Sequence, residues 1–192
     1  MIYTIGHSNH SLEAFLGLLT QHGITALADV RSVPYSRRHP DYNREVLQDW
    51  LKAHGIAYVF LGDQLGGRSR DPGDFAGERI DYGRLRAKEG FRAGIERLLQ
   101  GREQCRIVLL CAEKDPLNCH RGLLIAPELE KRNVPVGHIL ADGCLERHRP
   151  DTETRLLKAL GFSAEGDLFS SREELLEKAY WQQAQEFAYR LK

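Results

Sequence analysis

Two short segments contain the residue types best suited to chemistry in this 192-residue sequence: Cys111-Ala112-Glu113 and Cys119-His120-Arg121. A thiolate is a strong nucleophile, histidine and glutamate transfer protons, and arginine binds anions through two parallel hydrogen bonds. We therefore predict Cys111, Glu113, Cys119 and His120 as catalytic residues and Arg121 as a substrate-binding residue. The alternative that stays open is that both cysteines are small buried hydrophobic residues.

The positions of these segments favour a reactive thiol. Cys111 directly follows residues 107–110, a continuously apolar run typical of a central parallel strand. Cys119 precedes a helix predicted over residues 121–132, and free backbone N–H groups at a helix N-terminus lower the pKa of a nearby thiol. Ligands of parallel sheets bind beyond the carboxyl ends of the strands, so we expect the site there.

Loops after other predicted strands carry further candidate residues. His7 follows the first strand, and Asp29 lies at the end of the second; both are predicted to move protons. An ion pair between Asp29 and Arg31 that only holds the loop is an equally good interpretation. The predicted substrate-binding residues in these loops are Ser8, Arg31, Ser32, Ser36, Gly66 and Gly67. A cationic rim for phosphate is a further interpretation of Arg37, Arg38, His39, Arg68 and Arg70, although solvated loop charge is the commoner one.

A metal centre is the competing interpretation of the same residues. Cys111, Cys119 and His120, with His7 or Glu113, are types that bind zinc or iron. However, the sequence has no paired C-x-x-C knuckles, and the gap between the two cysteines is not a usual ligand spacing. The prediction therefore assigns no metal ligand and leaves the cofactor open.

The elements around these segments predict a single α/β domain with a mainly parallel five-stranded sheet flanked by helices. Strands are predicted at 2–5, 24–30, 57–61, 107–110 and 136–140, and helices at 11–22, 44–54, 82–100 and 121–132. Strands that alternate with helices in this way form parallel sheets covered on both faces. We assign residues 1–141 to this α/β domain and 142–192 to a helical C-terminal extension packed on it, with a final helical segment from Ser171 to Lys192.

Composition excludes several classes of protein. The 27 basic residues balance 27 acidic ones, so no global positive field attracts nucleic acid or a membrane surface. The apolar runs are too short to span a bilayer, and the N-terminal residues lack the pattern of a signal peptide. Four cysteines are too few for a disulfide scaffold in a chain of this size. We expect a cytoplasmic protein without a membrane partner.

The combination of motifs resembles a known family. Its segments are Thr4-Ile5-Gly6-His7-Ser8, Asp29-Val30-Arg31-Ser32 with Pro34 and Ser36, Leu65-Gly66-Gly67, and the two cysteine segments. Together they resemble the bacterial family called domain of unknown function 488, from Met1 to about Leu140. The resemblance implies a compact α/β domain with these motifs gathered in one cleft, and it implies no particular substrate.

The leading functional hypothesis is an enzyme that acts on a phosphate-bearing or otherwise anionic substrate, with a nucleotide or nucleic acid among the candidates. Arg31 and Arg121 would hold the anion, and Cys111 or Cys119 would be the nucleophile or redox thiol. The alternatives are a module that binds a nucleotide or nucleic acid without catalysis, and a Cys/His metal site. The sequence leaves the oligomeric state open.

Overall fold

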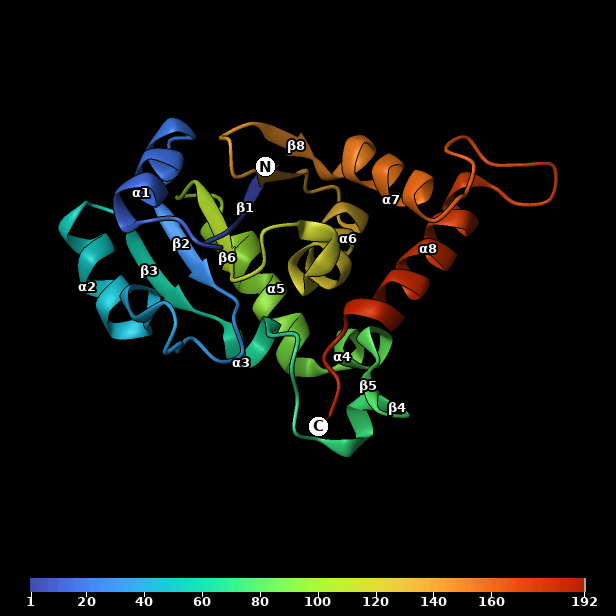
Figure 1. Cartoon of the computed structure of the whole chain (residues 1–192), viewed down its shortest axis with the longest axis horizontal. Coiled ribbons are helices and arrows are strands. Elements are labelled where there is room, and N and C mark those ends of the chain that lie inside the picture. Colours follow the sequence, from blue (N-terminus) through green and yellow to red (C-terminus); the bar gives the residue numbers. More distant parts are fainter. Residues whose placement is uncertain (192) are drawn as a thin grey trace.

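A six-stranded sheet forms the centre of the computed structural model, which describes residues 1–191 (Figure 1). In spatial order its strands are β3 (Ala57–Phe60), β2 (Ala26–Asp29), β6 (Ile107–Cys111), β1 (Ile2–Gly6), β7 (Val136–Ile139) and β8 (Leu145–Arg147). The first five are parallel, and β8 is antiparallel to β7. The predicted α/β domain with a mainly parallel sheet is confirmed.

The sixth strand, β8, is a difference from the predicted five strands and from the helix expected after Asp142. It pairs with β7 through a tight turn in which Gly143 adopts a positive φ of 84°. The strand has three residues, two of them charged. It is too short to show the alternation of apolar and polar residues that identifies a strand, so the sequence does not predict it.

Helices cover both faces of the sheet. The α-helices are α1 (Leu12–Gln21), α2 (Arg44–Ala53), α3 (Gly62–Leu65), α4 (Tyr82–Ala87), α5 (Glu89–Gly101), α6 (Ala126–Lys131), α7 (Glu153–Ala159) and α8 (Arg172–Phe187). A small hairpin, β4 (Phe75–Ala76) with β5 (Arg79–Ile80), lies beside the C-terminus (Figure 1). Among residues 1–191, no helix is long and apolar enough to cross a membrane.

The alternation of side chains along β6 explains the two layers of helices. Val108 and Leu110 belong to the hydrophobic cluster that includes α1 and α2, whereas Ile107 and Leu109 belong to the cluster that includes α5, α6, α7 and α8. A strand buried on both faces reads as a continuous apolar run, which is why residues 107–110 identify it. Truncating Leu109 to alanine should cost about 2–5 kcal/mol, because the side chain is fully buried.

Two predicted helices are interrupted. The segment 82–100 divides into α4 and α5 at Lys88, whose backbone is extended and whose side chain pairs with Asp71 and Asp74. The segment 121–132 begins as a π-helical turn, η4 (Arg121–Ile125), before α6. Pro127 lacks the N–H that an α-helix would use to bond the carbonyl of Leu123, and the guanidinium of Arg86 donates to that carbonyl instead.

The C-terminal segment packs on the sheet domain through α8. A capping box of Ser171 and Glu174 starts this helix, and Leu175, Leu176 and Ala179 enter the same core cluster as the sheet. The helix ends at Phe187 rather than continuing, and residues 188–191 run extended along the hairpin. Lys192, the end of the predicted helical segment, lies outside the described residues, and the domain boundary at 141 stays a prediction.

Candidate functional site

Loops from the carboxyl ends of three parallel strands meet at one place, as the sequence predicts. The backbone N–H of Ser8, after β1, donates to the carbonyl of Ala112, after β6 (3.0 Å). His120 Nε2 lies 3.0 Å from the carbonyl oxygen of Val30, after β2. Glycine at position 6 lets the loop after β1 come this close to the loop after β6, because a Cβ on Gly6 would lie 1.8 Å from the carbonyl oxygen of Glu113.

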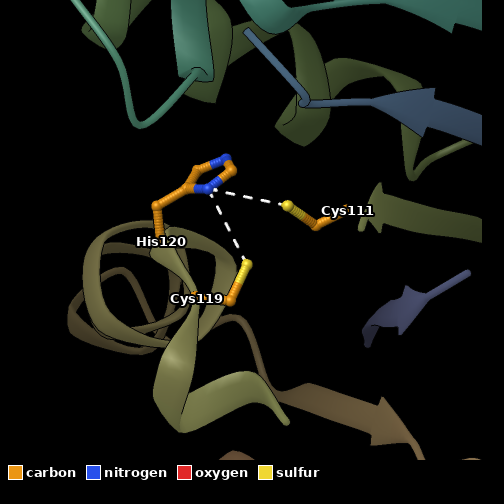
Figure 2. A group of neighbouring side chains, drawn as sticks. All are labelled: Cys111, Cys119 and His120. Atoms are coloured by element: carbon orange, nitrogen blue, oxygen red, sulfur yellow. Dashed lines mark hydrogen bonds between the residues drawn. The ribbon is translucent and has the colours of Figure 1, made fainter. Parts of the chain in front are cut away.

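A thiol–imidazole group lies at the centre of this region. Nδ1 of His120 is 3.7 Å from Sγ of Cys119 and 3.7 Å from Sγ of Cys111 (Figure 2). Cys111 ends β6, whereas Cys119 and His120 immediately precede the η4 turn. Both cysteines are 3 % exposed. The residues of the two segments thus form one buried group, although seven residues separate the cysteines.

The contact with Val30 fixes the tautomer of His120. A carbonyl oxygen only accepts hydrogen bonds, so Nε2 must carry the proton that it donates to Val30. Nδ1 is then free to accept a proton from a thiol. His120 therefore faces both sulfur atoms with the nitrogen that can act as a base.

Charges around the sulfur atoms separate their acidities. Burial raises the pKa of the Cys119 thiol, but the neighbouring Cys111 thiol and the charge of Arg121 outweigh burial and hold that pKa well below its usual value. His120 lowers the pKa of Cys119 further. The pKa of His120 is itself raised, because the Cys119 thiolate outweighs burial, which alone would lower it. Both pKa shifts favour a thiolate at Cys119 and an imidazolium at His120.

Cys111 stays protonated. Its Sγ donates to Oε2 of Glu113 at 2.7 Å, and burial, Cys119 and this carboxylate all raise the pKa of its thiol well above the usual value. A thiol that donates to a carboxylate has little tendency to ionise, because its thiolate would repel the carboxylate charge. The two thiols therefore differ in acidity: the pKa of Cys119 is lowered and that of Cys111 is raised.

Arg121 contributes a buried positive charge. Its side chain is 1 % exposed and donates to the carbonyl oxygens of Glu113 (2.6 Å) and Lys114 (2.9 Å). Within residues 1–191 it forms no ion pair, and its Nε has no hydrogen-bond partner. This charge lowers the pKa of the Cys119 thiol.

Asp29 and Arg31 form the ion pair that the sequence leaves as one of two interpretations. Arg31 donates to both carboxylate oxygens of Asp29, and the hydroxyl of Tyr58 donates to the same carboxylate at 2.8 Å. Arg31 also donates to the carbonyl of Tyr42. Asp29 is fully buried in this network, while Arg31 extends to the wall of the cavity described next.

A cavity of about 260 Å³ lies against the thiol–imidazole group. Seven residues that the sequence predicts as site residues line it: Arg31, Ser32, Gly67, Cys111, Glu113, Cys119 and His120. Gly67 lies directly against His120, because a Cβ on Gly67 would be 2.7 Å from the ring. A volume of this size accommodates a small ligand rather than a folded partner.

Six predicted site residues lie outside the wall of this cavity: His7, Ser8, Asp29, Ser36, Gly66 and Arg121. His7 stacks on Tyr42, and burial followed by the charge of Arg31 lowers its pKa to about 4. The hydroxyl of Ser36 accepts from two backbone N–H groups of its own loop. Gly66 packs tightly against Ser32. These residues support the loops around the cavity.

Several lining residues are ones that the sequence does not single out. Tyr82 begins α4, Asn118 precedes Cys119, and Phe187 and Tyr189 come from the C-terminal segment. The guanidinium of Arg68, a residue of the predicted cationic rim, lies over the ring of Tyr189 at 5.2 Å. Asn118 could have been inferred from its position beside Cys119, but no local pattern marks the aromatic residues.

Three side chains of the site also satisfy the distances of a metal centre. Ligand atoms of Cys111, Cys119 and His120 all lie within 4.8 Å of one another. Tetrahedral zinc places sulfur and nitrogen ligands about 3.6 Å apart, given Zn–S and Zn–N bonds of about 2.3 and 2.0–2.1 Å. The hydrogen bond from His120 to Val30 also matches the second shell of many zinc-bound histidines.

Fold and site together define a class: an α/β domain with a buried thiol–imidazole group at the carboxyl ends of its parallel strands. The chain belongs to the family described as domain of unknown function DUF488, whose model matches residues 11–126. The match includes both cysteine segments and the loop after β2, and it ends before the C-terminal segment. Comparisons with curated proteins and with solved structures found no match.

Proposed function

We propose that this protein is an enzyme in which Cys119 attacks a phosphate-bearing or otherwise anionic substrate. The observation that carries the proposal is the position of His120, whose Nδ1 faces the Cys119 sulfur at 3.7 Å while Nε2 is held by Val30. A nucleophile beside a base that a third group orients is the arrangement found in cysteine-dependent group transfer. The four free cysteines support a reducing, cytoplasmic setting.

Each residue of the group has a distinct role in this proposal. His120 takes the proton of Cys119 and keeps the sulfur ionised, so the thiolate is ready before substrate enters. As Cys119 forms a bond to the phosphorus of a phosphate ester, the bond to the leaving oxygen would break, and His120 would give that oxygen the proton taken from Cys119. Glu113, which lines the cavity, is the candidate base for the water that then releases the phosphate from sulfur. Asp29 orients the side chain of Arg31. His7 is neutral at neutral pH, because its pKa is about 4. Asp29 and His7 therefore act as supporting groups.

The charges around the cavity support an anionic substrate. Arg31 lines the wall, and Arg121 adds a buried positive charge that no carboxylate within residues 1–191 neutralises. Burial strengthens such interactions, because the local dielectric constant is low. Ser32 and the backbone at Gly67 add polar groups at the same wall.

The aromatic residues favour a nucleotide or nucleic-acid end among anionic substrates. Tyr82, Phe187 and Tyr189 line the cavity together with Arg31 and Arg68, so the lining offers aromatic surface for a ring and positive charge for a phosphate. Stacking of a base on an aromatic side chain contributes about 1–3 kcal/mol.

A substrate screen tests the proposal. Nucleotides, short oligonucleotides and other phosphate esters would be incubated with the protein and with Cys119→Ser, using the exposed Cys144→Ser as the control. We expect turnover that is lost in Cys119→Ser and retained in Cys144→Ser. Saturable, salt-dependent binding without any product would support the binding module instead.

A metal centre is the second candidate, because the mutual distances of Cys111, Cys119 and His120 favour it. Zinc on three protein ligands with an open fourth position would activate water rather than leave Cys119 as the nucleophile. Elemental analysis of protein purified without a histidine tag decides between the two. About one metal per chain, with Cys119 alkylated only after chelation, supports the metal centre, and a ratio near zero removes it.

A further inference from the structure

A second and larger cavity, of about 570 Å³, lies away from the thiol–imidazole group. It is bounded by the β5 end of the small hairpin, α4, the η4–α6 segment and α8, and it shares only Tyr82 with the first cavity. Its size is typical of sites for small organic ligands. Its walls are mainly apolar, with contributions from Ile80, Leu123, Pro127, Leu176, Trp181 and Ala184.

Arg86 provides a positive charge in this apolar cavity. Its Nη2 donates to the carbonyl of Leu123 at 3.0 Å, but its buried Nε has no hydrogen-bond partner. Across residues 1–191, Arg86 is in no ion pair. Burial lowers the pKa of its guanidinium, in keeping with a charge that lacks sufficient compensation. A positive charge without an ion pair is costly beside apolar walls, and an anionic ligand in the cavity would compensate it.

The carboxylates near this cavity are otherwise engaged. Glu153 accepts from Arg149 and Arg172, and Asp81 accepts from backbone N–H groups at the start of α4. Glu173 and Glu177 are exposed on α8 and are therefore hydrated. Of the cations that line this cavity, Lys131 and Arg149 are exposed and therefore hydrated, whereas Arg86 is half-buried. Arg86 is thus the charge that a ligand in the cavity could neutralise.

We propose that this second cavity binds an amphipathic carboxylate, a molecule in which an apolar chain or ring carries one carboxylate group. The carboxylate would pair with the guanidinium of Arg86, and the apolar part would cover the wall formed by Leu123, Leu176 and Trp181. This site is independent of the proposed chemistry at Cys119.

Trp181 gives a direct readout, because it lines the cavity and is 67 % exposed. The chain has two tryptophans, so Trp50→Phe leaves Trp181 as the single reporter. Dodecanoate, titrated below its micellar concentration, should shift the Trp181 emission to shorter wavelength and saturate. Dodecanol, which has the same chain without the charge, should bind at least about tenfold more weakly, because a hydrogen bond to a charged group is lost.

Arg86→Gln in the Trp50→Phe protein should weaken dodecanoate binding about tenfold or more and leave dodecanol binding unchanged. Arg92→Gln, an exposed arginine on α5, is the matched control and should bind dodecanoate as the parent does. Equal affinity for dodecanoate and dodecanol, or no saturable shift with either, would overturn the proposal. Because the ligand comparison uses protein with Arg86 intact, it remains decisive even if Arg86→Gln fails to fold.

Discussion

The Nε2 atom of His120 lies 3.0 Å from the carbonyl oxygen of Val30, ninety residues earlier in the chain. This contact joins the loop after β2 to the start of the η4 turn and determines which nitrogen of the imidazole faces the sulfur atoms. The acidity of Cys119 therefore depends on backbone packing as well as on nearby charges. Changes that displace the ring should alter thiol chemistry without touching either cysteine.

Gly67→Ala should displace the His120 ring. The new Cβ would lie 2.7 Å from Cβ and Cγ of His120, so one of the two segments must move. We expect a loss of about 1–3 kcal/mol in the free energy of unfolding, as for overpacked sites, and slower alkylation of Cys119. Gly17→Ala is the control, because open space surrounds that helix position, and it should stabilise the protein by about 0.5–1 kcal/mol. Unchanged Cys119 reactivity in Gly67→Ala would contradict this role of the contact.

Asp29→Asn should be strongly destabilising. The substitution leaves the charge of Arg31 buried without its partner, a change that typically costs about 3–5 kcal/mol. Urea unfolding measures the loss. Glu103→Gln removes the carboxylate of an exposed pair with Arg102 and should cost no more than about 1 kcal/mol. Similar losses in the two variants would mean that the buried pair contributes little.

Glu113→Gln should make Cys111 more acidic. The carboxylate charge is one of the causes that hold the Cys111 pKa well above its usual value, and glutamine keeps the shape of the side chain without that charge. Peptide mapping of iodoacetamide adducts as a function of pH should show Cys111 ionising at lower pH than in the parent. A Cys111 profile that does not move would show that burial alone controls this thiol.

Acidification should destabilise the fold through a buried histidine pair. His138 Nε2 and His148 Nδ1 are 2.9 Å apart, and His148 Nε2 lies 2.8 Å from the hydroxyl of Tyr180 on α8. Burial followed by Arg149 lowers the pKa of His148 to about 3, and burial followed by His148 lowers that of His138. Between the unfolded value of about 6.5 and the folded values, the unfolded state binds more protons, so stability falls as pH falls.

The slope of that loss is about 1.4 kcal/mol per pH unit for each histidine that titrates only in the unfolded state. Chemical denaturation at several pH values between 7 and 4 measures it. His148→Gln keeps a polar side chain that does not titrate, so its stability should depend less steeply on pH. An equal slope in the parent and in His148→Gln would assign the acid sensitivity to other groups.

The sequence predicts those parts of the site that follow directly from strands. Residues 107–110 identify the central strand, and with it the position of Cys111, because burial on both faces requires a continuous apolar run. Tyr82, Phe187 and Tyr189 cannot be predicted in this way, since they reach the cavity through tertiary packing of α4 and the C-terminal segment. The π-helical start of the η4–α6 segment is similar: Pro127 signals an irregularity, but the side chain that donates to the freed carbonyl of Leu123 is Arg86, far away in the chain.

The reaction rate of each cysteine with iodoacetamide, measured by peptide mapping between pH 5 and 9, tests the central claim most directly. An ordinary thiol with a pKa of about 8.5 is only roughly 0.3 per cent ionised at pH 6. Cys144, which is exposed, provides the internal reference. We predict that Cys119 reacts faster than Cys144 at pH 6 and that its rate depends on an ionisation well below 8.5. A Cys119 profile that rises only at or above that value would contradict the account.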